Sequence, residues 1–209
     1  MARLTLTTDA FVLLRRPSTS DAFQAVSVFS ESQGGLLILQ RVSKSKRPAA
    51  ANSVVPDLFS EAELVLESAN QGRTWFVRDA RVLRSAEGIG RDYEALRCAS
   101  GFAALVAQNA VAEESRAKVY ALLRRAFEAF ANAPRPDVAY VKCLYCLARD
   151  EGYPVKQQWF RSLVAPDREA VADLLNKPLA EQSVSVEEVA RLRAGLESWL
   201  RAETEILPG

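Results

Sequence analysis

Histidine is absent from the 209 residues of the chain, and cysteine occurs only three times. Without histidine the chain lacks the commonest general base and the usual Ser-His and Cys-His nucleophile arrangements. It also lacks the commonest nitrogen ligand for zinc. Three cysteines cannot form the disulfide framework of a small secreted fold. The composition argues against histidine-dependent enzymes and against a cysteine-stapled secreted domain.

Long apolar runs are absent too, and net charge is low. No run approaches the roughly 20 residues that a membrane-spanning helix needs. The first residues, MARLTLTTDAF, alternate and lack the apolar core of a signal peptide. We therefore expect a soluble, cytoplasmic protein with no membrane partner. The formal net charge is +1, so any attraction to nucleic acid must come from local clustering of cations.

The first part of the chain alternates with period two, which predicts β-strands. Alternating apolar residues occupy about five short runs, at 4–16, 22–30, 35–42, 61–68 and 73–79. The pattern leaves open whether 10–16 continues the run at Leu4 or begins a second strand. Turn signals stand at Gly34-Gly35 and at Asn70-Gln71-Gly72. A single small antiparallel barrel fits this count better than a two-sheet sandwich.

After Gly88 the apolar residues recur at helical spacing. The pattern predicts helices over 91–110, 115–133, 137–152 and 168–177, and a last helix that opens at Ser185 with Glu188 as a capping box. Asp167 is the expected N-cap of the helix at 168–177. The segment 137–152 is apolar nearly all round, which indicates a central buried helix. The predicted fold class is α+β, with a five-stranded barrel at 1–82 and an all-helical domain at 83–209.

A basic segment follows the predicted third strand. Arg41, Lys44, Lys46 and Arg47 fall within seven residues, and no acidic residue occurs between Glu31 and Asp57. Clustered cations bind nucleic-acid phosphates with salt-dependent affinity and little base specificity. A solvated basic loop is the alternative interpretation.

Further cations and aromatic residues lie on neighbouring strands and would extend such a groove. The cations are Arg15, Arg16, Arg73 and Arg78. Base stacking on aromatic side chains normally accompanies phosphate contact. Trp75 and Phe76 are adjacent in a predicted strand, so one of them faces outward unless both are covered.

Other polar groups have simpler interpretations. Cys143 and Cys146 form a CxxC within a predicted helix, and with only Cys98 and no histidine beside them we interpret them as small core residues. Glu61, Glu63 and Glu67 alternate on a strand and are interpreted as a solvated face. We expect no catalytic residue, no metal and no cofactor, and therefore no enzyme.

Several short motifs occur in an order that resembles the RecO family of bacterial recombination mediators. They cover most of residues 7–155 and are Phe29-Ser30, Gly34-Gly35, the basic segment 41–47, Leu58-Phe59, Tyr120-Ala121-Leu122-Leu123 and Gly152-Tyr153-Pro154. The chain departs from many relatives because residues 155–209 contain no cysteine, so their four-cysteine zinc module is absent.

The resemblance implies an OB-fold joined to a helical domain. It implies binding of single-stranded and duplex DNA, promotion of annealing, and help in recombinase loading together with RecR and the acidic C-terminal tail of single-strand-binding protein. Lys142, beside Arg135, is the candidate contact for that tail, with Arg124 and Arg125 as further candidates. A solvated helix face is the alternative for each of these cations. The alternative function is a non-enzymatic interaction or scaffold module whose OB-fold has lost DNA binding.

Overall fold

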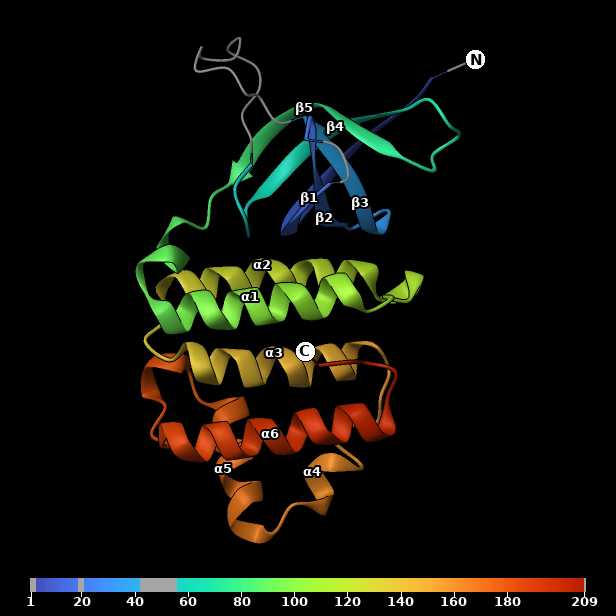
Figure 1. Cartoon of the computed structure of the whole chain (residues 1–209). Helices are drawn as coiled ribbons and strands as arrows, with labels where there is room; N and C mark the ends of the chain where they lie inside the picture. Colours follow the sequence, from blue (N-terminus) through green and yellow to red (C-terminus); the bar gives the residue numbers. More distant parts are fainter. Residues whose placement is uncertain (1–2, 19–20, 42–55, 209) are drawn as a thin grey trace. The chain divides into compact units, whose positions relative to one another are not determined.

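The protein is an α+β protein in which a five-stranded sheet precedes a set of helices (Figure 1). The structure, a computed structural model, describes residues 3–18, 21–41 and 56–208. Two compact units divide the chain, Met1–Ala86 and Glu87–Gly209. The division falls after Ala86 rather than after residue 82, because the last strand continues to Arg84.

The strands of the first unit pair in a closed ring. Their bounds are β1 (Leu4–Pro17), β2 (Phe23–Ser30), β3 (Gly34–Arg41), β4 (Glu61–Ser68) and β5 (Trp75–Arg84). The order around the closed barrel is β1-β2-β3-β5-β4, and β1 pairs with β4 as well as with β2. All pairings are antiparallel except the one between β3 and β5. The two apolar runs near the N-terminus thus form one continuous strand.

Alternation along the strands fills the barrel interior, because successive side chains of a strand point to opposite faces. Leu64 and Leu66 of β4 are almost fully buried there, with Val26 and Val28 of β2 and Ile38 of β3. The hairpin turns sit where the sequence predicts them. Gly34 (φ 70°) and Gly72 (φ 82°) take the left-handed conformation that glycine adopts without steric cost.

The second unit consists of helices packed around a central one. The helices are α1 (Tyr93–Gln108), α2 (Arg116–Asn132), α3 (Pro136–Asp150), α4 (Trp159–Ser162), α5 (Ala165–Asn176) and α6 (Val186–Glu203). Short 3₁₀ turns occupy Glu87–Arg91, Glu113–Ser115 and Leu179–Glu181. α3 contacts α1, α2, α5 and α6, and it lies between the α1 and α2 layer and α6 (Figure 1). This arrangement explains why α3 is apolar nearly all round.

Helix capping agrees with the sequence at α6 and differs at α5. The Ser185 side chain accepts a hydrogen bond from the backbone N–H of Glu188 (3.2 Å), as the capping box predicts. The prediction of Asp167 as an N-cap was wrong. α5 already begins at Ala165 and carries Pro166 in its first turn, a position where proline loses no helical hydrogen bond. Asp167 instead accepts two hydrogen bonds from the Arg191 guanidinium of α6 (2.7 and 2.8 Å).

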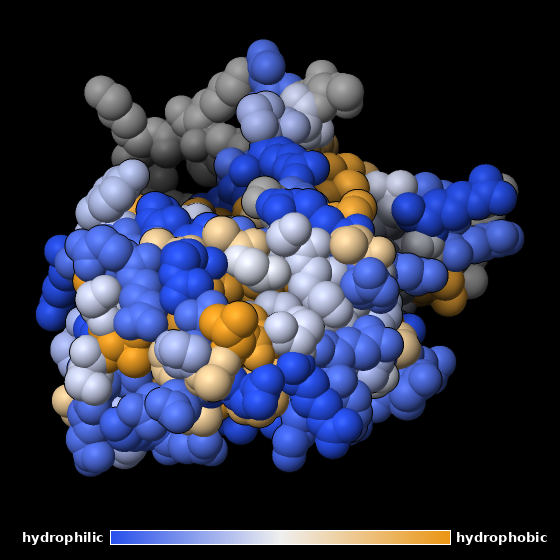
Figure 2. Space-filling view, turned by 90° about the horizontal axis from the view of Figure 1, so that it is seen from below, coloured by the Kyte–Doolittle hydropathy of each residue, from blue (hydrophilic) through white to orange (hydrophobic). Residues whose placement is uncertain are grey.

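The face drawn in Figure 2 is largely polar. On this face, hydrophobic colour is confined to separate patches between hydrophilic side chains. Within the described part of the chain, no helix combines the length and the apolarity that crossing a bilayer requires.

The barrel interior gives a first testable prediction. Leu64→Ala should lower the free energy of unfolding by about 2 to 5 kcal/mol, because it removes buried methyl groups and leaves a cavity. Urea unfolding followed by circular dichroism measures this loss. Leu37→Ala on the outer surface, where that leucine is 62% exposed, is the matched control and should change stability by less than about 0.5 kcal/mol. Equal losses for both variants would contradict the assignment of the interior.

Candidate functional site

The basic segment is only partly described by the structure. Arg41 is the last residue of β3 and its side chain is exposed. Lys44, Lys46 and Arg47 lie outside the described residues. The segment as a whole connects β3 to β4 in the chain, as expected. Of its four cations, Arg41 alone belongs to the described residues.

Arg15 and Arg16 are adjacent in β1 but point to opposite faces of the strand. Arg16 is exposed and makes no ion pair with any residue that the structure describes. Arg15 is half-buried, and its guanidinium donates a hydrogen bond to the backbone carbonyl of Pro56. Arg16 is available to an external phosphate, whereas Arg15 is engaged with the polypeptide.

Arg73 and Arg78 also differ. Arg73 is exposed in the turn that leads from β4 to β5, and no ion pair of its side chain is found in the described ranges. Arg78 lies inside β5 and donates to the Glu67 carboxylate at 2.6 Å. Arg3 approaches the same carboxylate at 3.7 Å. Glu67 is thus matched by two cations, and this small cluster keeps a net positive charge.

A ladder of cross-strand ion pairs covers the outer face of β4 and β5. Its three pairs are Glu61 with Arg84 (3.1 Å), Glu63 with Arg81 (3.1 Å) and Glu67 with Arg78 (2.6 Å). The interpretation of these glutamates as a solvated face was incomplete, since each is paired and the Glu61 side chain is only 3% exposed. The ladder takes up the cations of β5, so phosphate contact there would have to break ion pairs.

Arg16 of β1 and Arg41 of β3, for which no ion pair is found in the described ranges, lie on the outer face of the sheet, and a row of residues on this face ends at the ladder residue Glu67. The strand register aligns one row of residues across this face, in the order Arg16, Ala25, Leu39, Phe76 and Glu67. We call this set the outer row. Phe23 and Arg41 pair with each other in the next position on the same face. Leu37 also points outward here.

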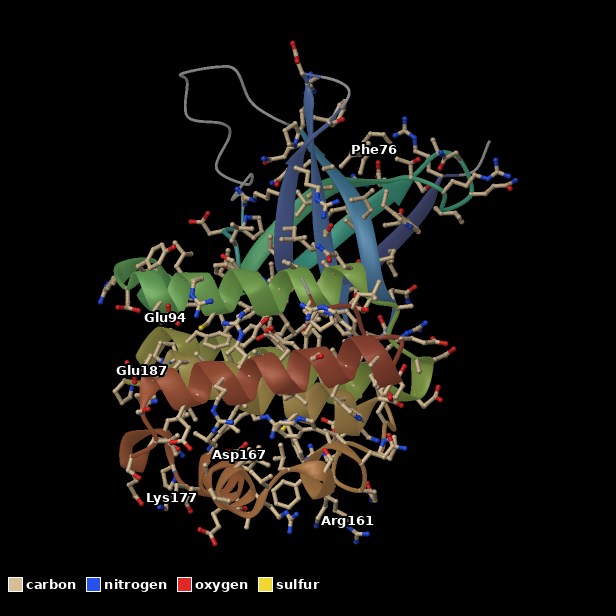
Figure 3. The ribbon with its side chains drawn as sticks, turned by 60° about the horizontal axis from the view of Figure 1, so that its bottom comes forward. Phe76, Glu94, Arg161, Asp167, Lys177 and Glu187 are labelled. Carbon is tan, nitrogen blue, oxygen red and sulfur yellow. The ribbon has the colours of Figure 1, made fainter. Side chains whose placement is uncertain are left out.

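Two aromatic rings meet at this face. The centroids of Phe23 and Phe76 are 5.3 Å apart with an interplanar angle of 68°, an edge-to-face arrangement. Phe76 is 36% exposed and lies on the surface of the barrel (Figure 3). Trp75 packs against the barrel interior. Of the two aromatic candidates, Phe76 is the one that faces outward.

This arrangement combines the two kinds of side chain that bind single-stranded nucleic acids, namely aromatic rings and arginines. Exposed ring faces stack with bases of any sequence, and arginines beside them neutralise phosphates. Phe23, Leu37 and Leu39 belong to this surface and were not among the predicted site residues. Their signal was available, since they alternate with the interior residues of β2 and β3 and must therefore point outward.

The four cations proposed for a protein partner have separate surroundings. Arg135 makes a two-pronged ion pair with Asp137 (2.8 and 2.9 Å). Arg124 lies over the Tyr120 ring, 5.4 Å from its centroid, and Arg125 is exposed on α2. Lys142 and Arg135 line different cavities. The structure does not assemble these four residues into one site.

Lys142 has a structural partner. Its ammonium donates to the backbone carbonyl of Lys177 at the end of α5 (2.7 Å), and the Gln182 amide donates to the same carbonyl (2.8 Å). A cation at this position also interacts favourably with the negative end of the helix dipole. Burial lowers the pKa of Lys142 below its ordinary value.

The three thiols are free and largely enclosed. Cys98 and Cys143 are buried, while Cys146 is half-buried on α3. Burial raises the pKa of all three, to about 12 for Cys98. The neutral thiol, a poor nucleophile, therefore dominates at physiological pH.

No family model matches the chain, and no curated protein matches it.

The buried thiols predict how stability depends on pH. Burial raises the pKa of Cys98 from 9.0 to about 12 in the folded protein. The contribution of the protonated Cys98 thiol to the free energy of unfolding is therefore fully present below pH 9. Above pH 9 the unfolded chain loses the proton first, so stability falls as pH rises toward 12. Cys98→Ala should make the decline in unfolding free energy between pH 9 and pH 10.5 shallower, as measured by urea unfolding at several pH values. Parallel declines in the two proteins would contradict this account.

Proposed function

We propose that the barrel is an OB-fold that binds single-stranded DNA on the outer face of β2, β3 and β5. The pairing order β1-β2-β3-β5-β4 and the short parallel contact between β3 and β5 support this assignment. OB-folds bind oligonucleotides on the face of strands 2 and 3 and with the loops that join strands 1 to 2 and 4 to 5. Here the same loops lead directly into Phe23 and Phe76.

One observation carries the proposal, namely the edge-to-face pair of Phe23 and Phe76 with arginines beside it that have no ion pair among the described residues. Arg41 is paired with Phe23 in the strand register, and Arg16 lies in the outer row with Phe76. Arg73 precedes Phe76 by three residues in the turn. Bases stacked on the rings would place their phosphates within reach of these cations.

We further propose that the chain acts as a RecO-like recombination mediator without catalytic residues. It would bind single-stranded and duplex DNA, promote annealing, and help to load a recombinase together with RecR and single-strand-binding protein. The order of motifs over residues 7–155 and the strand–helix organisation of the chain support this role. Arg135 is already paired with Asp137, and Lys142 already donates to the Lys177 carbonyl. The residues that would contact the acidic tail are therefore not assigned.

An interaction or scaffold module without DNA binding is the second candidate. The ion-pair ladder favours it, because Arg78, Arg81 and Arg84 are already neutralised on the barrel. Band shifts with single-stranded and duplex DNA at two salt concentrations separate the two candidates. A partner captured without any shift of DNA would favour the scaffold.

The aromatic pair provides the direct test. Phe76→Ala and Phe23→Ala should each weaken binding of a fluorescent oligothymidylate by about 5- to 150-fold, because each removes about 1 to 3 kcal/mol of stacking. Fluorescence anisotropy measures the affinity. Arg81→Ala, which changes an ion-paired cation of the same strand, is the matched control and should stay within about twofold of wild type. Unchanged affinity in both phenylalanine variants would reject the proposed surface.

The cations are tested through the salt dependence of the same affinity. Changing Arg16 and Arg41 together to alanine should flatten the slope of log affinity against log salt by about 1.4, since each single-strand phosphate contact contributes about 0.7. Changing Arg41, Lys44, Lys46 and Arg47 together tests the basic segment in the same way. A slope equal to that of wild type in either variant would remove the altered residues from the interface.

A further inference from the structure

A second candidate ligand site lies in the helical unit, between α3, α5 and the segment that forms α4. It is a cleft of about 460 Å³. Small-molecule sites usually measure about 300 to 1,000 Å³, so the cleft is large enough for a ligand of mononucleotide size. Its walls combine cations with aromatic rings.

The charge of the cleft has one sign. Lys142, Arg149 and Lys156 line it, and none of the lining residues, all of them described by the structure, is acidic. Arg149 is paired with Asp150 (2.8 Å), but Lys156 is exposed and forms no ion pair in the described ranges. The Lys156 ammonium is therefore free to meet an anion at the edge of the cleft.

Lys142 makes the strongest case for an anion. Its ammonium carries three donors, and the described residues provide it with one acceptor, the Lys177 carbonyl. It is half-buried, and no carboxylate pairs with it there. With the Lys177 carbonyl as its one described acceptor, the ammonium has donors left over for an anion. A phosphate oxygen in the cleft would accept from these donors.

The apolar part of the wall suits a planar ring. Tyr145 and Phe160 line the cleft together with Leu175. Tyr145 is 9% exposed and packs beside Trp159, with ring centroids 6.4 Å apart, so Phe160 offers the more open ring of the two. Aromatic side chains bind bases by stacking, in a largely sequence-tolerant way.

We propose that this cleft binds a nucleotide, with its base against Tyr145 and Phe160 and its phosphate between Lys142 and Lys156. The ligand has two possible sources, a free nucleotide or the phosphorylated terminal nucleotide of a strand. All residues that line the cleft belong to the helical unit, and the proposal does not depend on DNA binding by the barrel. No chemical step is involved, since the site holds the ligand without transforming it.

The test uses the full-length chain and a fluorescent adenosine monophosphate analogue, titrated by anisotropy. Saturable binding is expected in wild type. Lys156→Glu should weaken it at least tenfold, and Lys156→Arg should preserve it. Lys118→Glu makes the same charge change on the exposed surface of α2 and should stay within twofold of wild type. Equal binding by Lys156→Glu and Lys118→Glu would overturn the proposal.

Competition identifies which part of the ligand is recognised. Unlabelled adenosine monophosphate should displace the probe at lower concentration than adenosine or inorganic phosphate alone. If an acidic peptide displaces the probe and the mononucleotide does not, the cleft is a peptide site and the proposal is wrong. For a strand end, an oligonucleotide with a 5′-phosphate should bind wild type more tightly than one without, and Lys156→Glu should abolish that difference. A mononucleotide and a phosphorylated end that both fail to bind would also overturn it.

Cys146 offers a local readout, since it lines the same cleft while the other two thiols are buried. In wild type, saturating adenosine monophosphate should slow the reaction of Cys146 with a thiol reagent at pH 9 several-fold. In the Lys156→Glu variant, the same nucleotide concentration should leave the reaction rate of Cys146 unchanged. Equal reaction rates with and without nucleotide in wild type would contradict the placement of the ligand.

Discussion

The parallel contact between β3 and β5 closes the barrel, and the proposed binding surface depends on it. It consists of two register pairs, Ile38 with Trp75 and Leu39 with Phe76. The first pair directs its side chains into the interior, where Ile38 is almost fully buried. The second directs its side chains outward. Closure of the sheet therefore brings Phe76 to the face that β2 and β3 already form, and Phe23 meets it there.

The strand register also decides which charged residues of the barrel stand opposite one another. On β4 and β5 the outward glutamates and arginines stand opposite one another and pair. On β1, β2 and β3 no acidic residue faces Arg16 or Arg41 in the register. A chain with a formal net charge of +1 can in this way present a locally positive face. Local clusters of this kind bind phosphates even where the total charge provides no long-range attraction.

The sequence predicted what depends on local periodicity. Alternation identified the strands and the inward set that contains Leu64 and Leu66, and the glycine pairs located the turns. Apolarity on all sides of 137–152 identified the central helix. The capping box placed the start of α6. These features are encoded within a few neighbouring residues, so one sequence is enough to recognise them.

Contacts between distant residues could not be predicted in the same way. The pairing of Arg78 with Glu67 depends on the register of β4 and β5, which shifts between Val65 and Leu66. Phe23 meets Phe76 only because β3 pairs with β5 and so closes the barrel. Lys142 reaches a carbonyl 35 residues away at the end of α5. In each case residue type indicated a cation or a ring, and only the tertiary arrangement decided whether it was engaged or exposed.

Photo-crosslinking would test the central claim most directly. An oligonucleotide containing 5-iodouracil, irradiated in complex with the full chain, forms covalent adducts with aromatic side chains in contact with its bases. Mass spectrometry of the digested adduct should locate the link at Phe23 or Phe76. Adducts confined to residues 87–209, or no adduct despite measurable binding, would contradict the proposal that DNA lies on the outer face of β2, β3 and β5.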